Sequence, residues 1–67
     1  MKMISADAFI HELVPGGTII KVANYEEVVY QGKAEEIDFD LVCAYDVLMV
    51  RPISMHYYGN VLEIIIG

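Results

Sequence analysis

The sequence has too few cysteines for the covalent cross-links on which many small proteins depend. It holds one cysteine in 67 residues. A single cysteine excludes an internal disulfide and leaves no cysteine-rich zinc pattern. Chains shorter than about 70–80 residues usually need such a device, or self-association, to be stable. We expect one domain, residues 1–67, that lacks covalent cross-links.

Basic residues are also scarce. Four lysines and arginines stand against ten aspartates and glutamates, which gives a formal net charge of −6. Proteins that bind phosphate backbones carry basic patches, so direct nucleic-acid binding is not expected. No apolar run approaches the roughly 20 residues that span a bilayer, and the first seven residues lack a continuous signal-peptide core. We therefore expect a cytoplasmic protein without membrane contact.

Apolar residues, by contrast, are abundant. Hydrophobic residues make up 57% of the chain, and so small a domain has little interior in which to bury them. Another molecule is expected to cover the surplus. The sequence thus predicts a homo-oligomer, most simply a dimer, or an exposed apolar surface that binds a protein partner.

The first half of the chain predicts a helix and a hairpin. Ser5 is a candidate N-cap, and Pro15–Gly17 ends the helix. The helical stripe is Ala6, Phe9, Ile10 and Leu13. The period then changes to that of a strand over residues 19–23, and a turn at 24–26 leads into a second strand at 28–32.

Residues 34–45 fit two patterns. Ala34, Ile37, Leu41 and Tyr45 lie at helical spacing, whereas Ile37, Phe39 and Leu41 alternate with acids as in a strand. We favour a helix that restarts at Asp38 as an N-cap, because residues 33–36 have good helical propensity.

The last third predicts a second hairpin. Residues 47–51 form a β-type run, and Pro52 suggests an edge strand or a bulge. Gly59-Asn60 is a favourable turn pair, and residues 61–66 form a strand covered on both faces, with Glu63 as its only polar residue. The fold class is α+β, an αββαββ order with a mainly antiparallel four-stranded sheet and two short helices.

No set of residues indicates catalysis. Cys43 is expected to be a small core residue, and His11 and His56 show no ligand spacing. We predict no enzyme activity, no cofactor and no metal site.

The acidic residues are unevenly distributed. Seven of the ten lie between residues 26 and 46, where Lys33 is the only base. A surface of this kind attracts a basic cleft, although the alternative is an ordinary solvated face. The candidate partner-binding residues are Glu26, Glu27, Glu35, Glu36, Asp38 and Asp40.

A second candidate set surrounds the last turn. Tyrosines favour interfaces and stack on bases, and an arginine binds phosphate or pairs with a carboxylate. The possible ligand-binding residues are Arg51, His56, Tyr57 and Tyr58. Cross-strand packing of the tyrosines and an ion pair of Arg51 are the structural alternatives.

The segment from Val28 to Ile37, VVYQGKAEEI, is followed by a strand near Val47 and an apolar terminal strand. In this layout the chain resembles the short acidic proteins of bacteriophages and mobile elements. The resemblance implies a small non-enzymatic protein of a bacterial host's cytoplasm, of a kind that includes inhibitors of bacterial defence systems.

These observations predict a non-catalytic acidic protein-interaction module, whose more specific form is a phage-type inhibitor that occludes a nucleic-acid-binding defence protein of bacteria. The alternative is an oligomeric protein that sequesters a small molecule or nucleotide. A structural or regulatory subunit is a further alternative.

Overall fold

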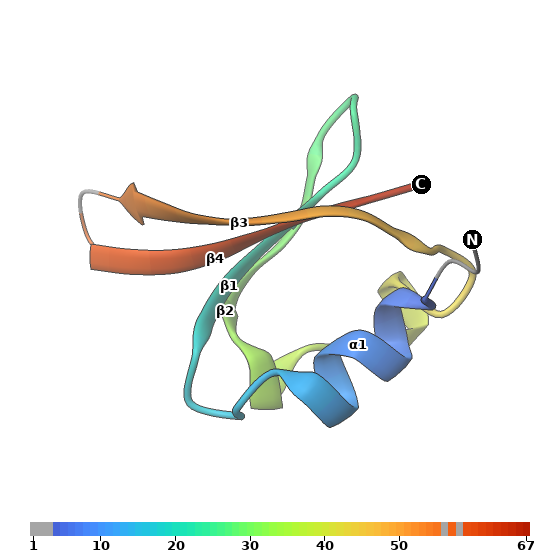
Figure 1. Ribbon diagram of the computed structural model, residues 1–67, viewed down its shortest axis with the longest axis horizontal. Helices are drawn as coiled ribbons and strands as arrows, with labels where there is room; N and C mark the ends of the chain where they lie inside the picture. The colour runs from blue at the N-terminus through green and yellow to red at the C-terminus, as the bar shows by residue number, and fades with distance from the viewer. Residues whose placement is uncertain (1–3, 56, 58) are drawn as a thin grey trace.

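Two β-hairpins lie side by side in one four-stranded sheet, and a helix packs on one face of it (Figure 1). The computed structural model describes residues 4–55, 57 and 59–67. The α+β class is as predicted. The elements in chain order are α1 (Ala6–Leu13), β1 (Ile19–Ala23), β2 (Val28–Lys33), the 3-10 turns η1 (Ala34–Glu36) and η2 (Phe39–Leu41), β3 (Val47–Met55) and β4 (Gly59–Ile66).

The sheet is mixed, which corrects the prediction of a mainly antiparallel sheet. The strand order is β2-β1-β4-β3. Both hairpins are antiparallel, but β1 and β4 pair in parallel at the centre of the sheet. The chain leaves β2 at one edge and returns as β3 at the other (Figure 1). The second hairpin therefore places its last strand, not its first, beside β1.

The helix α1 follows the predicted boundaries. Ser5 occupies the N-cap position, although its side chain makes no cap hydrogen bond. Ala6 and Ile10 are buried, whereas Leu13, at the end of the predicted stripe, is 60% exposed. Val14 has extended backbone angles and ends the helix, as expected before Pro15, because a residue that precedes proline avoids the helical region.

Residues 34–45 do not form the predicted α-helix. Two single-turn 3-10 helices take its place, separated by the extended residues Ile37 and Asp38. Like charges three or four residues apart destabilise a helix, and Glu35–Asp38 and Glu36–Asp40 are such pairs. The restart at Asp38 is confirmed, because its Oδ1 accepts a hydrogen bond from the backbone N–H of Asp40 at 3.0 Å.

The inward-facing residues of this segment also differ from the prediction. Ala34 and Ile37 are buried as expected, but Val42 fills the core in place of Leu41, which is exposed. Cys43 is exposed rather than part of the core. In a single helix, the buried residues would recur every three or four positions, which would bury Leu41. The two short turns break this spacing, so Val42 is buried and its neighbours Leu41 and Cys43 are exposed.

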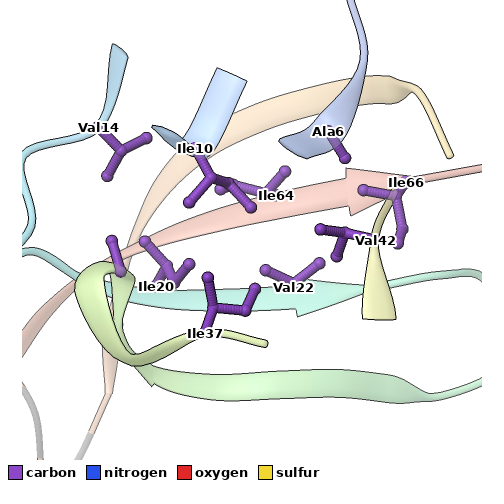
Figure 2. Packing of buried hydrophobic residues seen from close by; sticks show 10 residues of the cluster. Ala6, Ile10, Val14, Ile20, Val22, Ile37, Val42, Ile64 and Ile66 are labelled. Carbon is purple, nitrogen blue, oxygen red and sulfur yellow. The ribbon is translucent and has the colours of Figure 1, made fainter. Parts of the chain in front are cut away.

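The hydrophobic core lies between one face of the sheet and the layer formed by α1 and the connection from β2 to β3 (Figure 2). Ile10 of α1 points toward Ile64 of β4, and Val42 lies beside Ile66. The buried cluster consists of Ala6, Ile10, Val14, Ile20, Val22, Ala34, Ile37, Val42, Ile64 and Ile66.

The two hairpins were each predicted to turn at a particular pair or triplet of residues. The Asn24 side chain accepts hydrogen bonds from the backbone N–H groups of Glu26 and Glu27, at 2.7 and 2.8 Å, and so closes the predicted first turn. In the second hairpin, Gly59 pairs with Met55 inside the ladder. Asn60 likewise pairs with Ser54, so the predicted turn at Gly59-Asn60 is wrong, because both residues belong to strand β4. Gly59 has a φ of 71°, a conformation that glycine adopts without strain.

Strand β3 is an edge strand, as Pro52 predicted. Proline has no N–H to donate and is tolerated at a sheet edge. The bulge, however, falls between Val47 and Met49 rather than at the proline.

Candidate functional site

Two adjacent hollows lie between α1 and the two 3-10 turns. The first, of about 230 Å³, is lined by Asp7, Ala8, His11 and Phe39. The second, of about 320 Å³, is lined by Ile10, His11, Val14, Gly16, Ala34, Glu35 and Phe39. His11 and Phe39 line both, so the two hollows adjoin at these side chains. We call the pair of hollows the acidic groove, because each has a carboxylate in a lining that is otherwise mainly apolar.

Helical periodicity positions one wall of the acidic groove. Asp7 and His11 are four residues apart on α1, so they share one helical face. Val14, the residue that ends the helix, follows on the same wall. Asp7 lies in the first turn, where a negative charge is favourable to the helix dipole. Its Oδ1 accepts a hydrogen bond from the backbone N–H of Ala8 at 2.7 Å. The carboxylate is thus held at the helix start.

Backbone hydrogen bonds position the opposite wall. The N–H of Glu35 donates to the carbonyl oxygen of Gly16 at 3.0 Å, which ties η1 to the turn after α1. The Glu35 side chain lies against Gly16 so closely that a Cβ at Gly16 would stand 3.0 Å from its Oε2. On the same wall, Phe39 follows the Asp38 cap, and its ring meets that of His11 edge to face, with centroids 5.7 Å apart.

The six predicted partner-binding acids do not form one surface. Glu26 and Glu27 lie at the tip of the first hairpin, and Glu35 to Asp40 lie beyond the other end of β2. The six residues of β2 separate the two groups by about 20 Å. Figure 1 shows the hairpin tip projecting away from the layer that holds α1. Glu35, Glu36, Asp38 and Asp40 are exposed in the connection that borders the acidic groove.

The possible ligand-binding residues do not converge within the described part of the chain. Arg51 lies in the middle of β3, whereas Tyr57, 90% exposed, lies beyond the end of that strand. Four residues of extended chain separate Arg51 from Met55, a distance of about 13 Å. His56 and Tyr58 lie outside the described residues.

A charge cluster around the buried Glu63, on the other face of the sheet, was not predicted as a site. Glu63 of β4 is 5% exposed, and its register partners are Lys21 on β1 and Arg51 on β3. Arg51 Nε donates to Glu63 Oε1 at 2.5 Å, and Lys21 Nζ lies 3.5 Å from Oε2. The hydrogen bond from Arg51 lowers the pKa of Glu63 below its usual value, although burial acts in the opposite direction. The structural alternative for Arg51, an ion pair, is therefore confirmed.

The sheet curls on the face that carries Glu63, opposite the helical layer. Gln31 Nε2 of β2 donates to Met55 Sδ of β3 at 3.5 Å, although these strands are the two edges of the sheet. In a flat sheet they would be about 14 Å apart. The twist of the sheet therefore brings its two edges toward each other on the face that also carries Val61 and Glu63.

Three general properties bear on what this arrangement can do. Among the described residues, no group of three or more histidine, cysteine or acidic side chains could hold a metal ion. Within the same residues, no helix has the length and apolar character to cross a membrane. Comparison with protein-family models, with curated proteins and with solved structures finds no match for this chain.

Proposed function

We propose that the protein is a non-catalytic interaction module that binds a basic surface of another protein through the acidic groove. In its specific form, the proposal is that of a phage-type inhibitor, which covers the nucleic-acid-binding site of a bacterial defence protein. Inhibition would be steric and electrostatic, because an acidic protein seated on a phosphate-binding surface excludes the phosphate backbone.

The acidic groove is the observation that supports this proposal. A depression with an apolar lining and a charged border matches the anatomy of binding hot spots, in which a desolvated centre is surrounded by polar contacts. Asp7 and Glu35 line it, and three further acids lie in the adjacent connection: Glu36, Asp38 and Asp40. With a net charge of −6, the chain would also steer toward a basic partner over long range.

Two matched double variants test the proposal. Glu35→Gln with Glu36→Gln removes two charges beside the acidic groove, and Glu26→Gln with Glu27→Gln removes two at the hairpin tip. Each changes the net charge from −6 to −4, so their overall charge is the same. The tagged wild-type chain and both variants are used to capture proteins from a bacterial lysate at several salt concentrations, and the captured proteins are identified by mass spectrometry.

We expect the wild-type chain to capture a nucleic-acid-binding protein and to inhibit its binding to DNA or RNA. The groove variant should lose about tenfold in affinity and depend less on salt, whereas the tip variant should behave like the wild type. Equal losses in both variants would show that overall charge, not the groove, attracts the partner. Stoichiometric heats in calorimetry against a nucleotide panel would instead favour the sequestering alternative.

A further inference from the structure

We propose that the open face of the sheet binds the tip of the first hairpin of a second copy, so that two chains form a closed dimer. The open face is the sheet face opposite α1, and the tip is the turn that contains Tyr25, Glu26 and Glu27. The contact uses no residue of the acidic groove, so it does not depend on the partner of the proposed function. It gives a surface to the homodimer that the composition predicts.

The lysines and the arginine in the described part of the chain all lie on the open face. Arg51, Glu63 and Lys21 are register partners on three neighbouring strands. Lys33 lies two residues after Gln31, the partner of Lys21, and alternate residues of a strand share a face. The intervening residues of β1 and β4 pack in the core, so these four charges lie on the opposite face. With three positive charges and one negative charge, the open face is opposite in sign to the whole chain, at −6.

Two of these cations are accessible. Arg51 donates through Nε to Glu63, yet its side chain is 59% exposed. Lys33 is exposed, and among the described residues no carboxylate lies within ion-pair distance of it. Met49, which shares this face as the register partner of Ile65, is 47% exposed. The open face therefore combines accessible positive charge with an apolar side chain.

The tip of the first hairpin has the complementary features. In Figure 1 it lies beyond β3 and β4, on the side away from α1. Tyr25 is 81% exposed there, and tyrosine is enriched at protein interfaces. Glu26 and Glu27 are exposed, and neither forms an ion pair with a described residue. Asn24 accepts a hydrogen bond from the backbone N–H of each, so the turn is already shaped for contact.

A second copy brings these two surfaces together. Within one chain, Glu27 is six residues from Lys33, so about 20 Å of extended strand separates them. Two identical chains each carry one tip and one open face, and a two-fold axis allows the contact to form twice and closes the dimer. The net charge of −6 opposes the approach of two copies, but physiological salt screens charges that are more than about 8 Å apart. The pairs in direct contact then determine the outcome.

Complementary charge reversals test this contact. Lys33→Glu reverses a cation of the open face, and Glu26→Lys with Glu27→Lys reverses the tip. Glu36→Lys with Asp40→Lys is the matched control, because it also changes the net charge from −6 to −2 but lies in the connection beside α1. All five residues are exposed, and circular dichroism checks that each variant folds. Sedimentation equilibrium measures the mass of the full chain, of each variant alone, and of an equimolar mixture of the two reversed variants.

The wild-type chain should reach twice the 7.5 kDa mass of one copy. Each reversal alone should raise the dissociation constant of the dimer about tenfold or more, because like charges then meet across the interface. The mixture should recover the dimer, since each reversed surface then meets a surface of opposite charge. The control variant should dimerise like the wild type.

A wild-type chain that stays monomeric at about 1 mM, a concentration that populates even weak complexes, would overturn the inference. A dimer that neither reversal weakens, or a mixture that stays monomeric, would overturn it as well. These measurements use the purified chain alone, whereas the proposed function is tested by capture of a partner. Failure of one therefore leaves the other standing.

Discussion

Removal of the Arg51 side chain should destabilise the protein more than replacement of Glu63 by leucine. Arg51→Ala leaves the Glu63 carboxylate, which is 5% exposed, with only Lys21 as a counter-charge, 3.5 Å away. Glu63→Leu removes the buried charge itself. The two cations it leaves behind have side chains that are 25% and 59% exposed, so water can solvate them.

The expected loss lies between two limits. An exposed ion pair contributes about 0.2–1 kcal/mol, and breaking a fully buried one by removing one partner costs about 3–5 kcal/mol. Here the carboxylate is buried but the guanidinium is not, and Lys21 remains, so we expect Arg51→Ala to cost about 1.5–3 kcal/mol. A domain of this length has a total stability of only about 3–10 kcal/mol. Glu63→Leu should change stability by less than about 1 kcal/mol.

Urea unfolding, followed by circular dichroism, measures these differences. With a slope of about 1 kcal/mol per molar urea for so small a protein, the midpoint of Arg51→Ala should fall by about 1.5–3 M. Lys33→Ala is the matched control, because it removes one exposed positive charge from the β2 edge. A loss below about 0.5 kcal/mol for Arg51→Ala, or an equal loss for Lys33→Ala, would refute the view that Glu63 depends on Arg51.

Two further predictions concern the pH dependence of stability and the space around Gly16 and Gly17. Because Arg51 lowers the pKa of Glu63, the folded state binds the proton less readily than the unfolded state. The resulting stability should be fully present above the usual value of 4.5 and be lost as the pH falls through the lower folded pKa. Urea midpoints of Glu63→Gln should depend less on pH in this range, and an unchanged acid slope would contradict the assignment. Gly16→Ala should lower stability by about 1 kcal/mol, because its Cβ would stand 3.1 Å from Glu35 Cβ, which lies next to the backbone and cannot rotate away. Gly17→Ala, which has nothing within 4 Å, should be neutral or slightly stabilising in thermal unfolding, and equal losses in both would exclude the Glu35 contact as the cause.

Signals within one element predicted the local structure well. The apolar spacing of residues 6–10 and the stop at Pro15 define α1, because helical periodicity and proline act over a single turn. The Asn24 turn and the Asp38 cap could be predicted equally well, because each depends on a side chain that accepts a hydrogen bond from a backbone N–H two or three residues away. These are the parts of the fold in which the chain interacts with its own neighbours in sequence.

Properties that depend on distant segments were not predicted. No local sequence signal shows whether β3 or β4 of the second hairpin lies beside β1. The observed pairing of β4 with β1 is parallel, and it makes the sheet mixed. The same choice aligns Glu63 with Lys21 and Arg51. The sequence signs of that cluster were the lone acid Glu63 in an otherwise apolar strand and the expected ion pair of Arg51, whose partner could not be identified. The acidic groove was likewise predicted only in part, through Glu35, because Asp7 and Phe39 meet only after the chain has folded back over α1.

The burial of β4 changes the reason for expecting self-association. Residues 61–66 were predicted to be covered on both faces. Ile64 and Ile66 are fully buried in the core, and Val61 is 2% exposed on the opposite face. A second copy is therefore not needed to bury these three side chains.

Part of the exposed apolar surface lies on the edge strand β3. Leu48, Met49 and Val50 are consecutive there and 36–47% exposed. A second copy that extended the sheet at this edge would meet Pro52, which has no N–H for the ladder and is a common means of blocking edge pairing. Association at β3 would therefore depend on side-chain packing rather than on a continuous ladder. A partner at this strand would thus be selected by shape and apolar contact, whereas the partner proposed for the acidic groove would be selected by charge.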